Sequence, residues 1–224
     1  DDAAAAVVVT LGDGNDVFVA TANSGAITID LGAGTDAYTS AAGVDTITTG
    51  TGSDTITLVG TEADAANVIK DFTAGDGGDV IDFTSNDTSG QGTATLTEYA
   101  EYATAAAWAT ATAADTGDEG AGGVVVLGAN VTAGTEAALI TTINGANVIA
   151  DIVTTTGAGA TTDQLYVAAD NGVDTFLFHV INAGTATGDI GTILAGDTVT
   201  LLATFEGISD ATTLSANNFA DFIA

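Results

Sequence analysis

The first third of the chain repeats a short pattern of glycine, aspartate and one apolar residue. Four segments, 11–19, 31–39, 41–48 and 49–57, follow G-x-G-x-D-x-U-x, where U is apolar, with one or two departures each. Each x-U-x triplet predicts a short strand with one inward side chain, and each glycine pair predicts a tight turn. A further row is expected at 25–27, where Ala26 replaces the aspartate and Ile27 keeps the apolar position.

The aspartates of these rows follow a regular spacing. Asp36, Asp45 and Asp54 lie nine residues apart, and Asp16 lies twenty residues before Asp36. In a parallel β-roll two such rows complete one turn, so we expect Asp16, Asp36 and Asp54 on one side and Asp45 on the other. Carboxylates and turn carbonyls make an all-oxygen shell, which suits Ca²⁺. The glycines that would supply or expose these carbonyls are Gly12, Gly14, Gly32, Gly34, Gly43, Gly50 and Gly52.

A different block, residues 67–83, follows the rows and predicts a cap for the roll. Apolar residues on both sides of an acidic turn predict two strands, and solenoid ends need such an atypical layer. An Asp-Gly hairpin between the two strands is expected whether or not metal binds. The turn and its flanks add four candidate metal ligands, Asp71, Asp76, Asp79 and Asp82.

The rest of the chain predicts a small module of mixed α and β structure. The expected elements are a helix over 97–114 capped by Thr97, a buried strand at 124–127, a helix from Thr135 to about 144, a hairpin of 164–168 with 174–181, and a strand at 197–203. The Asn171-Gly172 pair is a turn signal between the hairpin strands. The predicted fold is therefore mainly β, with an N-terminal parallel β-roll followed by an α+β module.

The net charge and the composition exclude several classes of function. The 224 residues contain 30 acidic residues, one lysine or arginine and no cysteine, for a net charge of −29. One basic side chain cannot neutralise nucleic-acid phosphates or form a polybasic membrane patch. Without cysteine there is no disulfide and no thiolate metal site. Apolar residues make up 46% of the chain, which argues against plain disorder, and the unpaired acids favour a bound cation.

The sequence offers no recognisable catalytic set. The single histidine, His179, lies in an apolar strand pattern, and neither a G-x-S-x-G elbow nor an H-E-x-x-H motif occurs. The chain has enough carboxylates to form a catalytic pair of the glycosidase type, but the periodic spacing of these residues is already explained by metal binding. We therefore expect a protein that is not an enzyme.

Two other interpretations of the repeats stay open. One is a glycine-rich β-meander in which the aspartates only begin turns. The other is a flat threonine-rich face of the kind found in some ice-binding solenoids, formed by Thr46, Thr48, Thr55 and Thr57.

Residues 11–83 resemble the RTX (repeats-in-toxin) proteins that type I secretion exports from Gram-negative bacteria. The I-x-D-F…G-x-D-x-I-D-F block at 69–83 is similar to their roll terminator, and 214–224, ending Asp221-Phe222-Ile223-Ala224, is similar to their C-terminal secretion signals. The composition resembles that of RTX surface-layer proteins. One departure is that the first glycine of G-G-x-G is missing from every row.

The resemblance implies three regions: a roll with terminator at 1–84, an α+β module at 85–213 and a secretion-like tail at 214–224. It implies Ca²⁺ as cofactor, passage through the type I secretion apparatus, and a location outside the cell or on its surface. The expected function is a secreted structural protein that assembles with copies of itself into a layer or filament, without nucleic acid or membrane insertion. The alternative is the calcium-folding secretion and anchoring module of a larger secreted hydrolase or adhesin.

Overall fold

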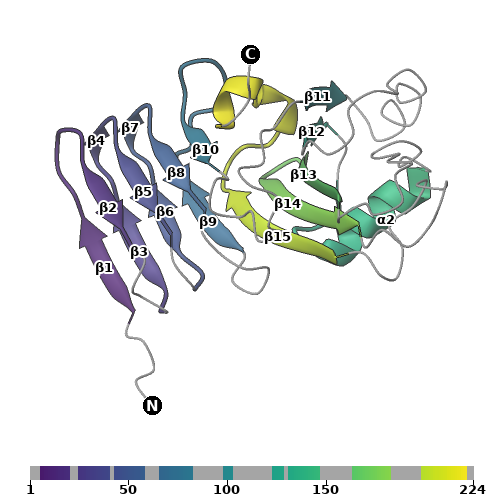
Figure 1. Cartoon of the computed structure of the whole chain (residues 1–224), viewed down its shortest axis with the longest axis horizontal. Coiled ribbons are helices and arrows are strands. Elements are labelled where there is room, and N and C mark those ends of the chain that lie inside the picture. The colour runs from purple at the N-terminus through teal and green to yellow at the C-terminus, as the bar shows by residue number, and fades with distance from the viewer. Residues whose placement is uncertain are drawn as a thin grey trace.

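The computed structural model describes residues 6–20, 25–40, 43–58, 66–82, 98–102, 123–128, 131–146, 163–182 and 198–220. Within these ranges the protein is mainly β, with parallel sheets and one α-helix (Figure 1). No helix in the described ranges is both long enough and apolar enough to cross a lipid bilayer.

The strands are β1 (Val7–Thr10), β2 (Val17–Val19), β3 (Ile27–Asp30), β4 (Ala33–Gly34), β5 (Ala37–Thr39), β6 (Thr46–Thr48), β7 (Thr51–Gly52), β8 (Thr55–Thr57), β9 (Asn67–Lys70), β10 (Val80–Asp82), β11 (Glu98–Tyr102), β12 (Gly123–Leu127), β13 (Asp163–Asp170), β14 (Thr175–Asn182) and β15 (Thr198–Phe205). The helices are α2 (Glu136–Ala146) and the 3₁₀ turns η2 (Ala211–Thr213) and η3 (Ala216–Asn218).

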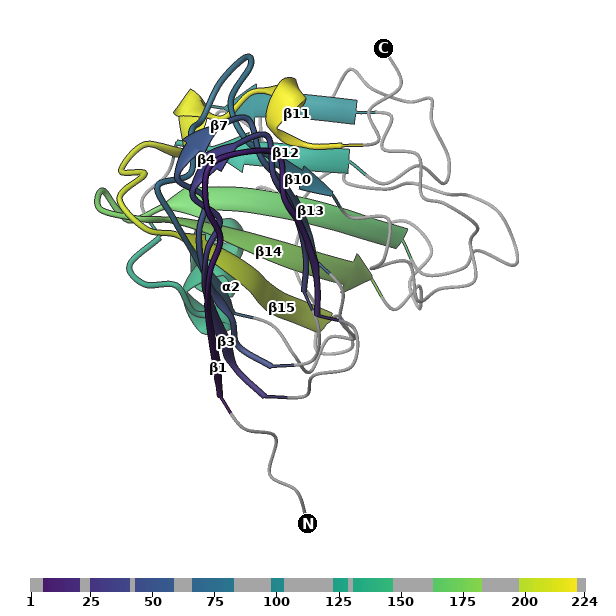
Figure 2. The same cartoon turned by 90° about the vertical axis from the view of Figure 1, so that its left-hand side faces the viewer.

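Strands β1 to β10, called here the N-terminal sheets, form two parallel sheets between which the chain alternates. One has the order β1-β3-β6-β9 and the other β2-β5-β8-β10, while β4 and β7 pair at one turn. Every pairing is parallel, and each strand lies beside its equivalent in the next pass of the chain. Viewed along this stack, the successive passes overlie one another (Figure 2).

The core of the N-terminal sheets comes from the middle residue of each short strand. In β5, β6 and β8 only the central residue is buried, and these residues are Tyr38, Ile47 and Ile56. All three are 0% exposed. The flanking residues stay partly accessible, because successive side chains of a strand point to opposite faces. The sequence prediction of one inward apolar residue per triplet is confirmed.

The N-terminal sheets continue into the second half of the chain. Strand β9 pairs in parallel with β15, so one nine-stranded sheet runs in the order β1-β3-β6-β9-β15-β14-β13-β12-β11. A salt bridge of 3.2 Å joins Lys70 Nζ at the end of β9 to Glu206 Oε2, just after β15. The boundary expected near residue 84 is therefore spanned by a sheet with strands from both sides.

Most elements expected in the second half are confirmed. Strand β12 is fully buried at Val124, Val126 and Leu127, and β13 and β14 form the expected antiparallel hairpin. Helix α2 follows Thr135, whose Oγ1 accepts a hydrogen bond of 3.2 Å from the Ala138 N–H. That bond is the usual contribution of a threonine N-cap.

The helix expected over 97–114 is wrong where the structure describes it. Residues Glu98–Tyr102 form β11, which pairs in parallel with β12, and the remainder of 97–114 lies outside the described residues. Alanine content favoured a helix, but the two tyrosines suit a strand equally well. Pairing with an existing sheet edge decided between these weak local preferences.

The hairpin expected within 67–83 is also wrong. Strands β9 and β10 lie in different sheets, β9 beside β6 and β10 beside β8. The connection from residue 71 to 79 therefore turns the chain from one sheet to the other, as in the preceding rows. Phe83, the last residue of this block, lies outside the described residues.

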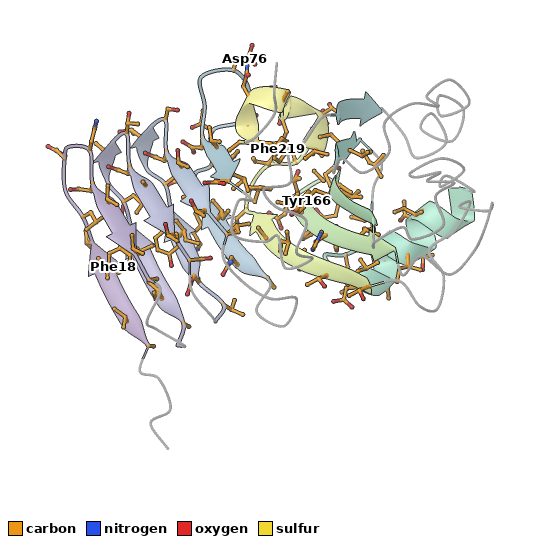
Figure 3. The ribbon with its side chains drawn as sticks, viewed as in Figure 1. Phe18, Asp76, Tyr166 and Phe219 are labelled. Atoms are coloured by element: carbon orange, nitrogen blue, oxygen red, sulfur yellow. The ribbon has the colours of Figure 1, made fainter. Side chains whose placement is uncertain are left out.

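The segment 211–220 packs onto this connection. Phe219 forms a parallel bridge with Ile81, the Ala220 N–H donates to the Ile81 carbonyl at 2.8 Å, and Leu214 and Phe219 are buried in the core of the N-terminal sheets (Figure 3). The described part of the tail expected at 214–224 is thus built into the fold, and residues 221–224 lie outside the described residues.

Candidate metal centre

Four aspartates form one column along the N-terminal sheets. Strand register places Val17, Ala37, Thr55 and Val80 side by side, so the residues just before them, Asp16, Asp36, Asp54 and Asp79, share one position in successive turns of the chain. Asp36, Asp54 and Asp79 are at most 1% exposed. The expected stacking of Asp16, Asp36 and Asp54 is confirmed, and Asp79 of the terminator extends the column.

Hydrogen bonds link the members of this column in one direction. Oδ1 of Asp36 accepts from the Asp16 N–H at 2.8 Å, Oδ1 of Asp54 from the Asp36 N–H at 2.8 Å, and Oδ1 of Asp79 from the Asp54 N–H at 2.9 Å. The carboxylates of Asp36, Asp54 and Asp79 thus each use one oxygen to accept a hydrogen bond from the backbone of the preceding turn. This use holds the side chains in a fixed orientation between rows.

The second carboxylate oxygens differ along the column. Oδ2 of Asp79 accepts from the Thr73 N–H at 2.8 Å, but Oδ2 of Asp36 and of Asp54 are buried without a hydrogen-bond partner. Burial raises the pKa of Asp54 above its usual range, and the negative charges of Asp79 and Asp36 raise it further. The hydrogen bond from the Asp36 N–H acts in the opposite direction and lowers the pKa. Unpaired buried carboxylate oxygens are costly, and a cation is the partner that their charge demands.

The glycines of the turns make room for close approach between rows. A Cβ on Gly32 or Gly50 would collide with the carbonyl of the equivalent glycine one turn earlier, Gly12 or Gly32. Gly34 and Gly52 are packed in the same way, onto the carbonyls of Gly14 and Gly34 respectively. Backbone carbonyls of successive turns therefore lie close to the next turn's backbone, and a Cβ on Gly34 would also lie 2.9 Å from Oδ1 of Asp36. Each carbonyl has two lone pairs to offer. This donor set, carboxylate plus carbonyl, is the chemistry that Ca²⁺ prefers.

The other side of the N-terminal sheets is built differently. Register aligns Ile27, Asp45 and Asn67, so Ile27 itself occupies the aspartate position and Ile29 is the inward residue of that row. The sequence assignment is therefore wrong by one residue for the aspartate position, given to Ala26, and by two residues for the inward position, given to Ile27. Oδ1 of Asp45 accepts from the Ile27 N–H, and Oδ1 of Asn67 accepts from the Asp45 N–H, both at 2.8 Å.

Asp45 also differs from Asp36 and Asp54 in its second oxygen. The Tyr38 hydroxyl donates to Oδ2 of Asp45 at 2.8 Å. Burial and the Asp45 carboxylate raise the pKa of Tyr38, so the hydroxyl keeps its proton. Gly43, the turn glycine of this row, has φ +121° and lies close to the Gly25 carbonyl.

The remaining terminator acids do not join the column. Asp71 is exposed with φ 59°, and Asp82 Oδ2 accepts from the Thr57 hydroxyl at 3.2 Å. Asp76, at the tip of its loop in Figure 3, accepts from Ser215 Oγ at 3.0 Å and Asn217 Nδ2 at 2.8 Å. Across the described ranges no cluster of three or more His, Cys, Asp or Glu side chains could hold a metal. A site on the column would therefore combine two carboxylates with backbone oxygens.

Sequence reasoning missed two residues of this region, Asn67 and Tyr38. Asn67 precedes Val68 as Asp45 precedes Thr46. Asn67 could therefore have been identified from the sequence if an asparagine had been accepted at the aspartate position of the repeat. The contact between Tyr38 and Asp45 joins residues from different sheets, and no local pattern signals it.

His179 lies away from these residues, on β14. It is 4% exposed and stacks on Tyr166 with ring centroids 4.8 Å apart. Burial lowers the pKa of His179 to about 4, so the ring is neutral at pH 7. No protein-family model matches the chain, and no curated protein matches it either.

Proposed function

We propose that the N-terminal sheets are a calcium-binding β-roll of the RTX type, in a secreted, non-enzymatic structural protein. The observation that carries this proposal is the pair of buried, unpartnered carboxylate oxygens on Asp36 and Asp54. Both lie in one column beside glycine turns whose carbonyls crowd together. Asp16, Asp36, Asp54 and Asp79 would hold the ions, with carbonyl oxygens from the turns of Gly12, Gly14, Gly32, Gly34, Gly50 and Gly52.

Calcium would supply the charge that the fold lacks. At −29, the chain has too few basic groups to neutralise its own acids, and the three-residue strands β5, β6 and β8 bury only one apolar residue each. Binding to the folded chain alone stabilises it by RT ln(1 + [Ca²⁺]/Kd), so folding follows the calcium concentration. The chain would stay unfolded in the low calcium of a bacterial cytosol, pass through the type I apparatus, and fold outside.

Circular dichroism tests this directly. In excess chelator we expect little β signal from the N-terminal sheets, and in millimolar calcium a full signal with a higher melting temperature. Equimolar magnesium is the control, because Mg²⁺ demands a small octahedral shell and holds its waters tightly. The same β signal in chelator and in calcium would contradict the proposal.

The self-assembly expected of a surface layer or filament has a candidate surface at the open end of the stack. Strands β1 and β2 lie farthest from β11–β15 and each pairs on one edge only (Figure 1). Val8, Val17 and Val19 are 77%, 75% and 55% exposed there. An edge with free backbone groups and apolar side chains favours pairing with another chain. We propose that copies associate through this end once calcium has reduced their repulsion.

A further inference from the structure

We propose that the N-terminal sheets bind calcium along one side only. On the opposite side, the hydrogen bond between Tyr38 and Asp45 takes the place of a metal ion. This inference rests on the proposed calcium function and narrows it. The repeats have glycine and aspartate on both sides, so spacing alone assigns ions to both. The structure separates the two sides by what each carboxylate contacts.

The first step is the number of carboxylates. The column of Asp16, Asp36, Asp54 and Asp79 has a carboxylate in every turn, so neighbouring turns can share an ion. Both oxygens of Asp79 already accept hydrogen bonds, which makes the pair Asp36 and Asp54 the best placed to share one. The opposite column reads Ile27, Asp45, Asn67, with one carboxylate between an apolar and a neutral residue. Calcium takes six to eight oxygens and gains most from charged ones, so one carboxylate makes a poor site.

The second step is the state of the oxygens. Asp45 is 0% exposed, and both its oxygens accept hydrogen bonds of 2.8 Å, from the Ile27 N–H and the Tyr38 hydroxyl. A cation at Oδ2 would have to displace this hydroxyl. On the other side, Oδ2 of Asp36 and Oδ2 of Asp54 have no donor to displace. The Tyr38 hydroxyl therefore gives Oδ2 of Asp45 a partner, whereas the partner of Oδ2 of Asp36 would be a cation.

The third step is the position of Tyr38. It comes from β5, in the opposite sheet from β3 and β6, and is itself 0% exposed. Its ring stacks on Phe18 with centroids 5.9 Å apart and planes 10° apart (Figure 3 labels Phe18). The equivalent residue one turn later is Ile56, which has no polar group. The hydroxyl is therefore present in a single turn, where it reaches Asp45.

Calorimetric titration of calcium into three variants tests the inference. Asp45→Asn keeps an oxygen for the Ile27 N–H, and we expect the same number of ions as in the wild type, with Kd changed by less than about twofold. Asp36→Asn is the matched control, because it keeps the oxygen for the Asp16 N–H. There we expect one ion fewer, or a Kd raised at least tenfold. Tyr38→Phe should melt at a lower temperature in saturating calcium yet bind an unchanged number of ions.

The outcomes separate this inference from the proposed function. If the wild type binds no calcium, both fail. If the wild type binds calcium and Asp45→Asn loses an ion as Asp36→Asn does, the one-sided model is overturned while calcium binding stands. Should Asp45→Asn not fold, Tyr38→Phe decides: an ion lost in that variant contradicts the one-sided model, whereas an unchanged or larger number of ions supports it.

Discussion

At the scale of single residues, contact between rows makes glycine necessary at some turns and optional at others. A Cβ on Gly34 would press into the Gly14 carbonyl and lie 2.9 Å from Oδ1 of Asp36, whereas a Cβ on Gly12 would meet nothing within 4 Å. We expect Gly34→Ala to lower the free energy of unfolding by about 1–3 kcal/mol through overpacking. Gly12→Ala should change it by less than about 0.5 kcal/mol.

Urea unfolding of both variants in saturating calcium measures this difference. Equal effects of Gly34→Ala and Gly12→Ala would mean that the rows are not packed as closely as described. A calcium titration of Gly34→Ala should also show weaker binding, because the substitution disturbs the Asp36 carboxylate.

His179 gives a pH prediction at the same scale. Its pKa falls to about 4 in the folded protein, so between pH 6.5 and 4 the unfolded chain binds a proton that the folded chain does not. Stability is therefore lost as the pH falls through this range, by about 2 kcal/mol at pH 5 relative to pH 7. His179→Phe keeps a ring beside Tyr166 and should lack this contribution. Melting curves at pH 7 and pH 5 in saturating calcium measure how much stability each protein loses over this range. An equal loss in the wild type and in His179→Phe would contradict the assignment of this pH dependence to His179.

The sequence predicted the column of Asp16, Asp36 and Asp54 because a strict spacing fixes which residues stack. It did not separate Asp45 from them, since a hydroxyl from another sheet satisfies the second oxygen of Asp45. Spacing predicts which residues of one column stack, but it does not report contacts between the two sheets.

At the scale of elements, hydrogen bonds of the Asn218 side chain hold η3 against the connection between β9 and β10. Its Oδ1 accepts from the Gly75 and Ser215 N–H groups at 2.7 and 2.9 Å, and its Nδ2 donates to the Asp79 carbonyl at 2.7 Å. The side chain is 0% exposed. Asn218→Ala leaves these buried groups unpaired, and we expect it to cost about 2–4 kcal/mol and to free the segment that carries Phe219.

Limited proteolysis in calcium checks this prediction, with Asn217→Ala as the control. Asn217 is exposed, and its Nδ2 donates to Oδ1 of Asp76 at 2.8 Å. Cleavage near the C-terminus should become faster in Asn218→Ala and stay close to wild type in Asn217→Ala. Equal cleavage in the two variants would show that the segment is not held by Asn218.

Elements with strong local signals were predicted well, and those decided by distant pairing were not. The Asn171-Gly172 turn and the Thr135 cap located β13, β14 and α2. Strand β11 and the separation of β9 from β10 depend on which sheet edges are available, which local propensity does not report.

At the scale of the whole molecule, the open end of the stack predicts how copies meet. Val17→Glu adds a charge to β2, and we expect it to reduce assembly in millimolar calcium at least fivefold while calcium-induced folding stays intact. Val173→Glu is the control: Val173 is 62% exposed at the β13–β14 turn, far from this end. Both variants carry the same extra charge.

Light scattering through a calcium titration, followed by electron microscopy, measures assembly. The wild type should be monomeric in chelator and form sheets or filaments in millimolar calcium. A wild type that remains a monodisperse monomer at every calcium level would remove the self-assembly proposal and favour the secretion and anchoring module of a larger protein.

The pairing of β9 with β15 also sets an order of events during folding. The Gly75–Asn218 hydrogen bond spans 143 residues, and β9 gains one of its two neighbours only when β15 has packed against it. Contacts of such sequence separation are slow to form, because a long loop must close before they are gained. Once calcium is present, the turns of the N-terminal sheets can stack through contacts that are short in sequence, but the edge at β9 stays open until β15 pairs with it. Residues far along the sequence therefore complete the sheet that the N-terminal strands begin.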